Sequence, residues 1–287
     1  MNLIETKALV YYYGAGTPFE IRALDCVDLS LCRGGIKAVI GHTGSGKSTL
    51  IQHFNALLKP ASGKVFFQGK NINESKESAY RIRFKIGLCF QYPEYQLFED
   101  TVYRDIAFGP KNMGLSPEET ERAVKKAAAY VGIEPELFER SPFELSGGQK
   151  RRIAIAGVMA MDPDVLILDE PTAGLDPSGR EMILRMICDY RKKTDKTVML
   201  VSHSMDDVAR IADEVIVVDH GKIAMQGSVE EIFSHSSELT AMGLSVPEVT
   251  GITDKLRNAG CSLPTGIYTV EQAADAICAY LSGRCPK

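Results

Sequence analysis

Short apolar runs alternate with longer segments of helical periodicity over most of the chain. The runs at 36–40, 165–168, 198–201 and 215–218 predict buried strands. Between them, apolar residues at helical spacing predict helices that cover the sheet: Leu50, Ile51, Phe54, Leu57 and Leu58, and later Ile183, Met186, Ile187 and Tyr190. Such alternation is typical of an α/β fold with a mostly parallel sheet.

Residues 92–160 follow a different pattern, dominated by helix signals. Ser116 and Glu119 are spaced as a capping box, with Pro117 at the first helical position. Apolar residues then recur at helical spacing: Val124, Ala127, Ala128 and Val131. We therefore expect a helical subdomain inserted in the α/β core.

The pattern changes again after Gly227, so we expect a main domain at 1–227 and a small helical appendage at 228–287. The appendage contains two short amphipathic stretches, with apolar positions at Val246, Val249, Ile252 and Leu256, and at Val270, Ala274, Ile277 and Leu281. Thr269 and Gln272 form a second capping box. These stretches either pair two subunits or cover the sheet edge within one chain.

Composition narrows the classes of protein. With 287 residues, 45% hydrophobic and 24% charged, the chain has an ordinary globular composition. The net charge of −4 without basic blocks argues against a nucleic-acid partner. Seven scattered cysteines favour reduced thiols in the cytosol. The longest apolar run, at 153–161, is about half the length of a membrane-spanning helix.

The strongest chemical signal is the GxxxxGK[ST] sequence at 41–48, directly after a predicted strand and before a predicted helix. Glycines allow a tight loop whose N–H groups face phosphate oxygens, Lys47 adds a positive charge for the β- and γ-phosphates, and the Ser48 hydroxyl can bind Mg²⁺. We expect this loop and the following turn to bind nucleotide through Gly41, Thr43, Gly44, Ser45, Gly46, Lys47, Ser48 and Thr49.

A second signal is the apolar strand at 165–168 that ends in Asp169 and Glu170. Strands of this kind deliver carboxylates to the edge of the sheet where α/β proteins bind ligands. We expect Asp169 to hold Mg²⁺ and Glu170 to orient or polarise the water that attacks the γ-phosphate.

A third signal is the Leu-Ser-Gly-Gly-Gln sequence at 145–149, before a basic triplet and an apolar helix. Ser146 would cap a helix whose N–H groups, beside Gly147 and Gly148, face a phosphate. With the two motifs above, this sequence resembles the signature of ATP-binding cassette ATPases. The resemblance implies that residues Ser146 to Gln149 close over the nucleotide of a second cassette. We expect the basic triplet at 150–152 to be a solvated helix face.

The resemblance assigns further residues. Gln91 matches the Q-loop glutamine that reaches Mg²⁺ and the attacking water, and Asp176 matches the D-loop at the dimer interface. His203 matches the switch histidine that contacts the γ-phosphate. Tyr13 matches the aromatic that stacks on adenine, although Tyr12 stands next to it.

Over essentially its whole length, the chain is similar to the ATPase subunits of energy-coupling factor (ECF) transporters. The similarity includes residues 16–20, 90–98, 108–112 and 154–157. The sequences at 108–112 and 154–157 are closer to the second of the two subunit types. The resemblance implies an ATP- and Mg²⁺-dependent ATPase at the cytoplasmic face of the cell membrane. It would bind a second ATPase subunit, identical or paralogous, and a membrane T component, which works with substrate-binding S components to import vitamins or transition-metal ions.

The segment from Gln91 to Asn112 is rich in aromatic residues with interspersed acids. We expect it to form a groove for a helix of the T component, with acids such as Glu94 available to a basic residue; packing within the helical subdomain is the alternative. Two other functions are a soluble cassette ATPase acting on a cytosolic macromolecular complex and a non-hydrolytic nucleotide-binding regulator. The interval from Gln91 to Leu145 is too short for long coiled-coil arms, and the presence of Glu170 and His203 argues against the regulator.

Overall fold

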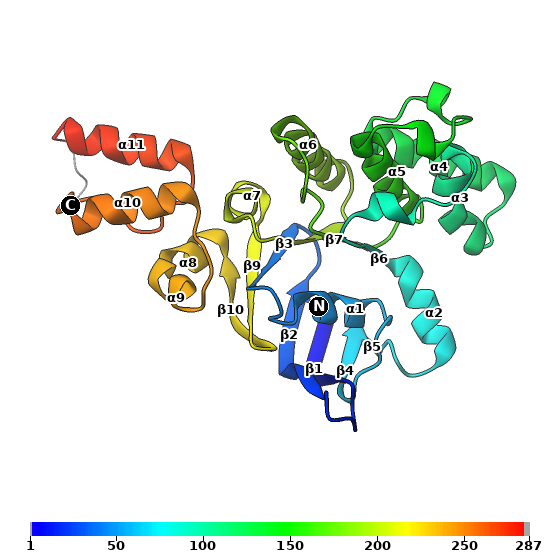
Figure 1. The fold of residues 1–287 in the computed structure, drawn as a ribbon, viewed down its shortest axis with the longest axis horizontal. Coiled ribbons are helices and arrows are strands. Elements are labelled where there is room, and N and C mark those ends of the chain that lie inside the picture. The colour runs from blue at the N-terminus through cyan, green and yellow to red at the C-terminus, as the bar shows by residue number, and fades with distance from the viewer. Residues whose placement is uncertain (1, 284–287) are drawn as a thin grey trace.

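A six-stranded sheet forms the centre of the molecule in the computed structural model, which describes residues 2–283 (Figure 1). The strand order is β10-β9-β3-β8-β7-β6. The strands are β3 (Ile36–Ile40), β6 (Ile86–Cys89), β7 (Val165–Asp169), β8 (Thr197–Val201), β9 (Glu214–Asp219) and β10 (Lys222–Ser228). Pairing is parallel except between β9 and β10. The mostly parallel sheet and its four expected strands are confirmed.

A second sheet of four antiparallel strands lies beside the first, in the order β2-β1-β4-β5. It contains β1 (Asn2–Tyr13), β2 (Ile21–Cys32), β4 (Ser62–Phe67) and β5 (Lys70–Asn71). The apolar runs described above do not predict these strands. Register shifts break the pairing of β1 with β2 at several points, and such bulges interrupt a regular two-residue alternation.

The central sheet is buried on both faces. Ile167 and Met199 pack toward the antiparallel sheet and the helix α1 (Lys47–Phe54), whereas their neighbours Leu168 and Leu200 pack toward the helices on the other face. Alternate residues of one strand thus enter different cores, because successive side chains point to opposite sides of a sheet.

The first predicted helix is shorter than expected. α1 ends at Phe54, and Ala56 adopts a left-handed backbone conformation with φ of 54°. Leu57 and Leu58 therefore lie beyond the helix, and the expectation that they extend its buried face was wrong: Leu57 is 41% exposed.

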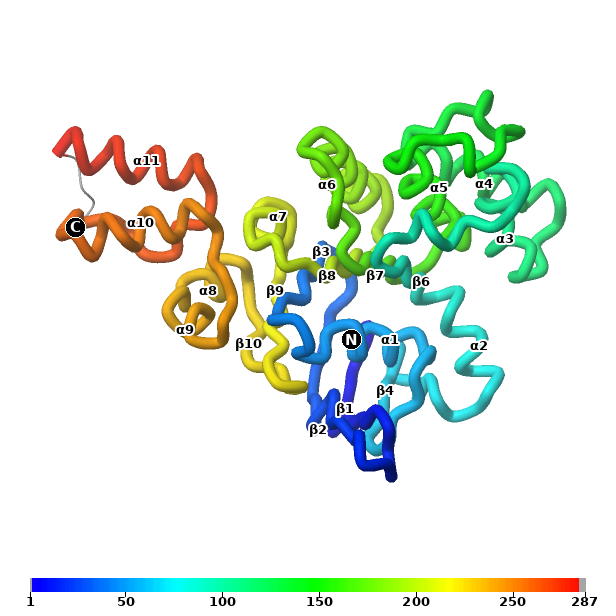
Figure 2. Tube along the Cα trace, viewed as in Figure 1, coloured from blue at the N-terminus to red at the C-terminus, as the bar shows by residue number. Residues whose placement is uncertain are grey.

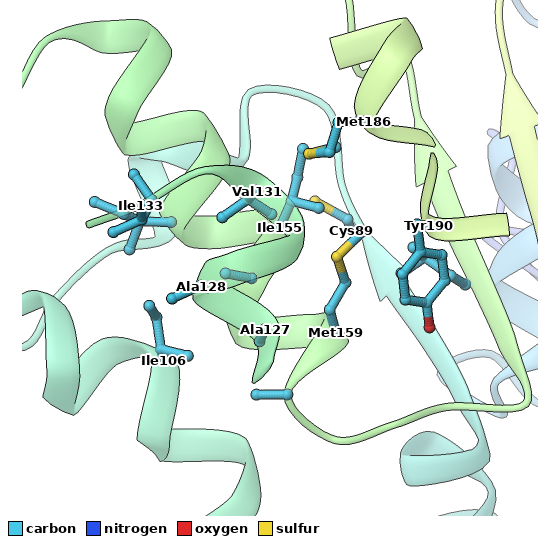
Figure 3. Close-up of a cluster of buried hydrophobic side chains, with 14 of the residues drawn as sticks. Cys89, Ile106, Ala127, Ala128, Val131, Ile133, Ile155, Met159, Met186 and Tyr190 are labelled. Atoms are coloured by element: carbon cyan, nitrogen blue, oxygen red, sulfur yellow. The ribbon is translucent and has the colours of Figure 1, made fainter. Parts of the chain in front are cut away.

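Several helices are inserted between β6 and β7, after α2 (Lys76–Lys85). The insert contains the 3₁₀ helices η1 (Pro93–Gln96), η2 (Pro135–Leu137) and η3 (Pro142–Glu144), and the α-helices α3 (Val102–Asn112), α4 (Pro117–Val131) and α5 (Gly147–Met159). The Ser116–Glu119 capping box is confirmed. Figure 3 shows Val131 of α4 beside Ile155 of α5, in a core that also receives Met186 and Tyr190 of α6 (Pro177–Lys193).

The C-terminal part of the chain, as far as residue 283, contains five helices. α7 (Met205–Ile211) precedes β9 and β10, and α8 (Val229–Ser234), α9 (Ser236–Ala241), α10 (Glu248–Asn258) and α11 (Val270–Leu281) follow them. The first three of these cover β3 and β9, while α10 and α11 lie together at one end of the molecule (Figures 1 and 2). The Thr269–Gln272 capping box is confirmed. The expected apolar face of α11 is largely uncovered, because Val270 and Leu281 are 70% and 77% exposed. Within residues 2–283, none of the helices is both long and apolar enough to span a bilayer.

Candidate nucleotide-binding site

The loop at 41–46 connects β3 to α1 at the edge of the central sheet. Two of its glycines are required by space: a Cβ on Gly41 would lie 2.2 Å from the Val218 carbonyl oxygen, and one on Gly46 would lie 2.6 Å from the Ala23 carbonyl oxygen. Gly46 also has φ of 107°, a conformation that favours glycine. No side chain caps α1, so its first N–H groups remain available to an anion.

Lys47 folds back over this loop. Its Nζ donates hydrogen bonds to the carbonyl oxygens of Gly41 (2.7 Å) and His42 (2.9 Å), and the residue is buried. Burial lowers the pKa of Lys47, although Glu170 and Asp169 oppose this shift. The arrangement holds a cation at the mouth of the loop, where phosphate oxygens would compete with the two carbonyls.

Ser48 and Asp169 meet although they lie on α1 and β7. The Ser48 hydroxyl donates to Asp169 Oδ2 at 3.2 Å. Burial raises the pKa of Asp169, against the lowering effects of Ser48 and Lys47. A hydroxyl and a buried carboxylate side by side are hard oxygen donors, the set that Mg²⁺ prefers, so these residues fit the ion.

Glu170 lies directly after β7 with its backbone in the left-handed region, at φ of 50°. Such conformations are uncommon outside glycine and concentrate at functional sites. Its Oε1 lies 2.8 Å from His203 Nδ1, on the loop after β8. Burial and the neighbouring Asp169 raise the pKa of Glu170 to about 7, while burial lowers the pKa of His203. The structure thus places a carboxyl group of raised pKa beside an imidazole of lowered pKa.

The remaining residues expected at the nucleotide lie around this edge. Tyr13 is 43% exposed and its hydroxyl lies 3.1 Å from Thr49 Oγ1, while Tyr12 packs against Arg22. Of these two tyrosines, Tyr13 is the one that contacts α1. Ser45 is buried at the centre of the loop, and Thr43, Gly44 and Gln91 are exposed.

The signature residues lie on α5, in the inserted helices (Figure 1). Ser146 and Gln149 form a capping box with each other, and a Cβ on Gly147 or Gly148 would meet no atom within 4 Å. The start of α5 is thus open. Asp176 caps α6 by accepting a hydrogen bond from the Gly179 N–H group.

The burial and the contacts of Arg151 contradict two expectations, one for the basic triplet at 150–152 and one for Glu94. It is only 2% exposed, so the basic triplet is not simply a solvated helix face. Its guanidinium binds both carboxylate oxygens of Glu94, at 2.9 and 2.6 Å, and the carbonyl oxygens of Pro171 and Ala173. Glu94 is therefore engaged within the chain and is not available to a partner. The residues that flank Arg151 in the sequence give no indication that it pairs with Glu94, which lies 57 positions away.

A second network was missed because its members are distant in the chain. Asp207 accepts hydrogen bonds from Thr172 and Arg180, and Arg180 also donates to Ser204. Asp207 is buried and its charge also contributes to the raised pKa of Glu170. This network connects the segment after Glu170 to the segment after His203.

Comparisons with known proteins agree with this geometry. Residues 24–173 match the model of the ABC transporter family. The chain has a TM-score of 0.75 and 38% identity to the structure of cbiO1 from Clostridium perfringens, described as part of the ABC transporter complex cbiONQ, covering 88% of this chain and 99% of that one. It has a TM-score of 0.69 and 27% identity to a dimeric post-hydrolysis state of the ATP-binding cassette MJ0796 bound to ADP and Pi, covering 78% and 98%. The fold and the site define an ATP-binding cassette ATPase.

Relatives over the full length refine this class. The energy-coupling factor transporter ATP-binding protein EcfA2 of Caldanaerobacter subterraneus subsp. tengcongensis is 50% identical over 280 residues, 98% of each chain. The protein of the same name from Clostridium acetobutylicum is 52% identical over 279 residues, 97% of this chain and 98% of that one. The chain belongs to this family of energy-coupling factor ATP-binding proteins and is of the A2 type.

Proposed function

We propose that the chain is the ATP-hydrolysing subunit that powers an ECF-type importer of vitamins or transition-metal ions, through ATP-driven closure of two cassettes. Membership of the ECF ATP-binding family supports the transporter function. The observation that carries the closure mechanism is that the two helix starts suited to phosphate binding belong to different parts of the molecule, α1 at the central sheet and α5 in the inserted helices (Figure 1). The phosphate loop meets Asp169 at one edge, while the open start of α5 has its capping groups satisfied within itself.

A second cassette completes each site in this mechanism. The exposed start of α5, with Gly147 and Gly148 facing open space, supplies N–H groups to the phosphate held by the loop of the partner. Asp176 of the D-loop is exposed at the start of α6. The partner is either a second copy or the paralogous ATPase.

The site residues have separate roles in this proposal. Lys47 and the N–H groups of the loop bind the β- and γ-phosphates, and Tyr13 stacks on adenine. Glu170 orients or polarises the attacking water, and His203, 2.8 Å from it, contacts the γ-phosphate. These groups position the attacking water and the nucleotide and neutralise negative charge on the phosphates, which is most of what phosphoryl transfer requires from a protein.

Mg²⁺ would be held by Ser48 and Asp169, with Gln91 approaching from the end of β6. When bound, the ion neutralises negative charge on the phosphates. The chain contributes the Ser48 hydroxyl from α1 and the Asp169 carboxylate from β7, whose oxygens lie 3.2 Å apart and would determine the position of the ion.

A groove beside the Q-loop is the proposed binding site for the membrane T component, and S components are contacted only through it. A cavity of about 350 Å³ is lined by residues of α3, α5 and the segment after β6. Phe98 and Phe108 line it with their rings 4.9 Å apart and with 59% and 44% of each residue exposed. Exposed aromatics in a concave site are typical anchors for a partner helix.

We also propose that 1–227 is the cassette domain, with its helical subdomain at about 92–160, and that 228–287 is an appendage. α8 and α9 pack against β3 and β9, so this part covers the sheet in cis. Val270 and Leu281 of α11 are exposed apolar residues, so we assign subunit pairing to α10 and α11. The assembled protein would be peripheral, at the cytoplasmic face of the membrane.

The test is co-expression with a T component and both ATPase types, followed by detergent extraction and purification through a tag on this chain. We expect a complex that contains the T component and releases phosphate from ATP. Quantitative recovery of the chain with ribosomes or a soluble assembly, with none on the T component, would instead support the soluble cassette ATPase.

A further inference from the structure

Two histidines and one aspartate gather beside the phosphate loop, outside the residues assigned to nucleotide. His42 Nε2 lies 3.2 Å from Asp219 Oδ1, and His220 Nε2 lies 3.8 Å from the same oxygen. One ligating atom from each residue lies within 4.8 Å of the other two. Imidazole nitrogens with a carboxylate oxygen are a common set of ligands for Zn²⁺ and related transition-metal ions.

The contact between His42 and Asp219 lacks a hydrogen bond in the structure. His42 Nδ1 lies 2.8 Å from the Thr43 carbonyl oxygen, which can only accept a hydrogen bond, so Nδ1 carries the proton. In the neutral ring, Nε2 then presents a lone pair to the carboxylate. Both His42 Nε2 and Asp219 Oδ1 are shielded from solvent and have no hydrogen-bond partner in residues 2–283. Two such buried acceptors facing each other are costly unless a positive charge lies between them, which either a second proton on the imidazole or a bound cation supplies.

The backbone of the β9–β10 hairpin holds His220, the third residue of the group, beside His42 and Asp219. His220 and Gly221 form the two-residue turn of the β9–β10 hairpin, with φ of 43° and 74°. Positive φ at both positions is typical of a type I′ turn, where asparagine and glycine are preferred to histidine. The Gly221 N–H group donates to the Ser45 carbonyl oxygen at 2.8 Å, which ties this turn to the phosphate loop.

We propose that His42, Asp219 and His220 bind one divalent transition-metal ion, preferably Zn²⁺, with the remaining position open to water. Zinc bonds of about 2.0–2.1 Å place tetrahedral ligands about 3.3 Å apart. The 3.2 Å separation of His42 and Asp219 matches this, and His220 is exposed enough to rotate closer.

The Thr43 carbonyl oxygen acts as the outer hydrogen-bond partner that orients a metal-binding imidazole. The site differs in chemistry from the oxygen ligands at Ser48 and Asp169. A bound ion would fasten residue 42 of the phosphate loop to the β9–β10 hairpin.

The test is calorimetric titration of Zn²⁺ into the nucleotide-free full chain in excess Mg²⁺. His220→Asn removes one ligand and keeps a residue that tolerates positive φ, and Asp219→Asn removes the ligating carboxylate. His235→Asn is the matched control, since His235 is exposed and lies 2.8 Å from Glu238 in a simple histidine–carboxylate pair.

We expect the unmodified chain and His235→Asn to bind one equivalent of Zn²⁺ alike, and His220→Asn and Asp219→Asn to bind it at least about tenfold more weakly. Zn²⁺ should also raise the melting temperature of the unmodified chain and not that of His220→Asn. Unchanged binding in both ligand variants would place the metal elsewhere in the chain and overturn the proposal. Absence of Zn²⁺ binding to the unmodified chain would overturn it as well. Normal circular dichroism of each variant controls for folding.

Discussion

Arg151 and Glu94 form a buried two-point ion pair between the signature helix and the Q-loop segment. Arg151 Nε and Nη2 donate to the two oxygens of Glu94, while Nη1 donates to the carbonyl oxygens of Pro171 and Ala173. Burial raises the pKa of Glu94, but the hydrogen bonds and charge of Arg151 hold it below its usual value. One side chain therefore connects α5, η1 and the segment after Glu170.

Replacing Arg151 by Met should lower the free energy of unfolding by about 3 kcal/mol, because it leaves a buried carboxylate without its partner. Denaturant unfolding measures this change. Lys150→Met, the neighbouring cation on the same helix, is the control and should change stability much less. Removing Glu94 as well, as in Arg151→Met/Glu94→Gln, should recover part of the loss; a fully additive loss would contradict direct coupling.

Glu170→Gln should retain ATP binding and lose turnover by about 100-fold or more, because an amide is a poor acceptor for the proton of the attacking water. Phosphate release by the intact complex and ATP affinity are the two measurements. Asp195→Asn, on the loop before β8, is the control for loss of one carboxylate. Near-normal turnover in the variant would remove Glu170 from its assigned role.

Lys47→Ala should weaken ATP binding about tenfold or more, as expected for loss of charge-assisted hydrogen bonds worth about 1.5–3 kcal/mol. Hydrolysis should fall as well. Equilibrium titration with a fluorescent ATP analogue checks the affinity, with Lys59→Ala, an exposed lysine after α1, as the control. An unchanged affinity would contradict the assignment of the phosphate loop.

The isolated chain should be nearly inactive as a monomer, because each site needs the start of α5 from another cassette. Its specific activity should rise only when a second cassette joins it, either another copy at higher protein concentration or the paralogous ATPase. Activity measured over a dilution series, with mass measured by light scattering, tests this. A constant specific activity in samples that remain monomeric would show that one cassette is sufficient.

Phe98→Ala/Phe108→Ala should reduce recovery of the T component and leave nucleotide affinity unchanged, since both rings line the proposed groove. Quantitative co-purification measures recovery. Met182→Ala removes an apolar side chain that is similarly exposed, at 47%, on α6 and serves as the control. Equal recovery for the two variants would exclude these rings as anchors.

The amino-acid sequence was sufficient for features that depend on neighbouring residues. The phosphate loop, the four central strands, the capping boxes at Ser116 and Thr269 and the helix cap at Ser146 were all predicted. A cap needs only residues three apart, and a buried strand needs only a continuous apolar run. The assignment to the ECF ATP-binding family was likewise carried by contiguous motifs.

The tertiary structure decided which distant residues meet. Arg151 and Glu94 are 57 positions apart, and His42 reaches Asp219 only because β9 lies beside β3 in the sheet. The antiparallel sheet also depends on pairing across register shifts that local periodicity does not contain. Burial, and with it the raised pKa of Glu170, arises from packing of separate elements, so no local pattern could specify it.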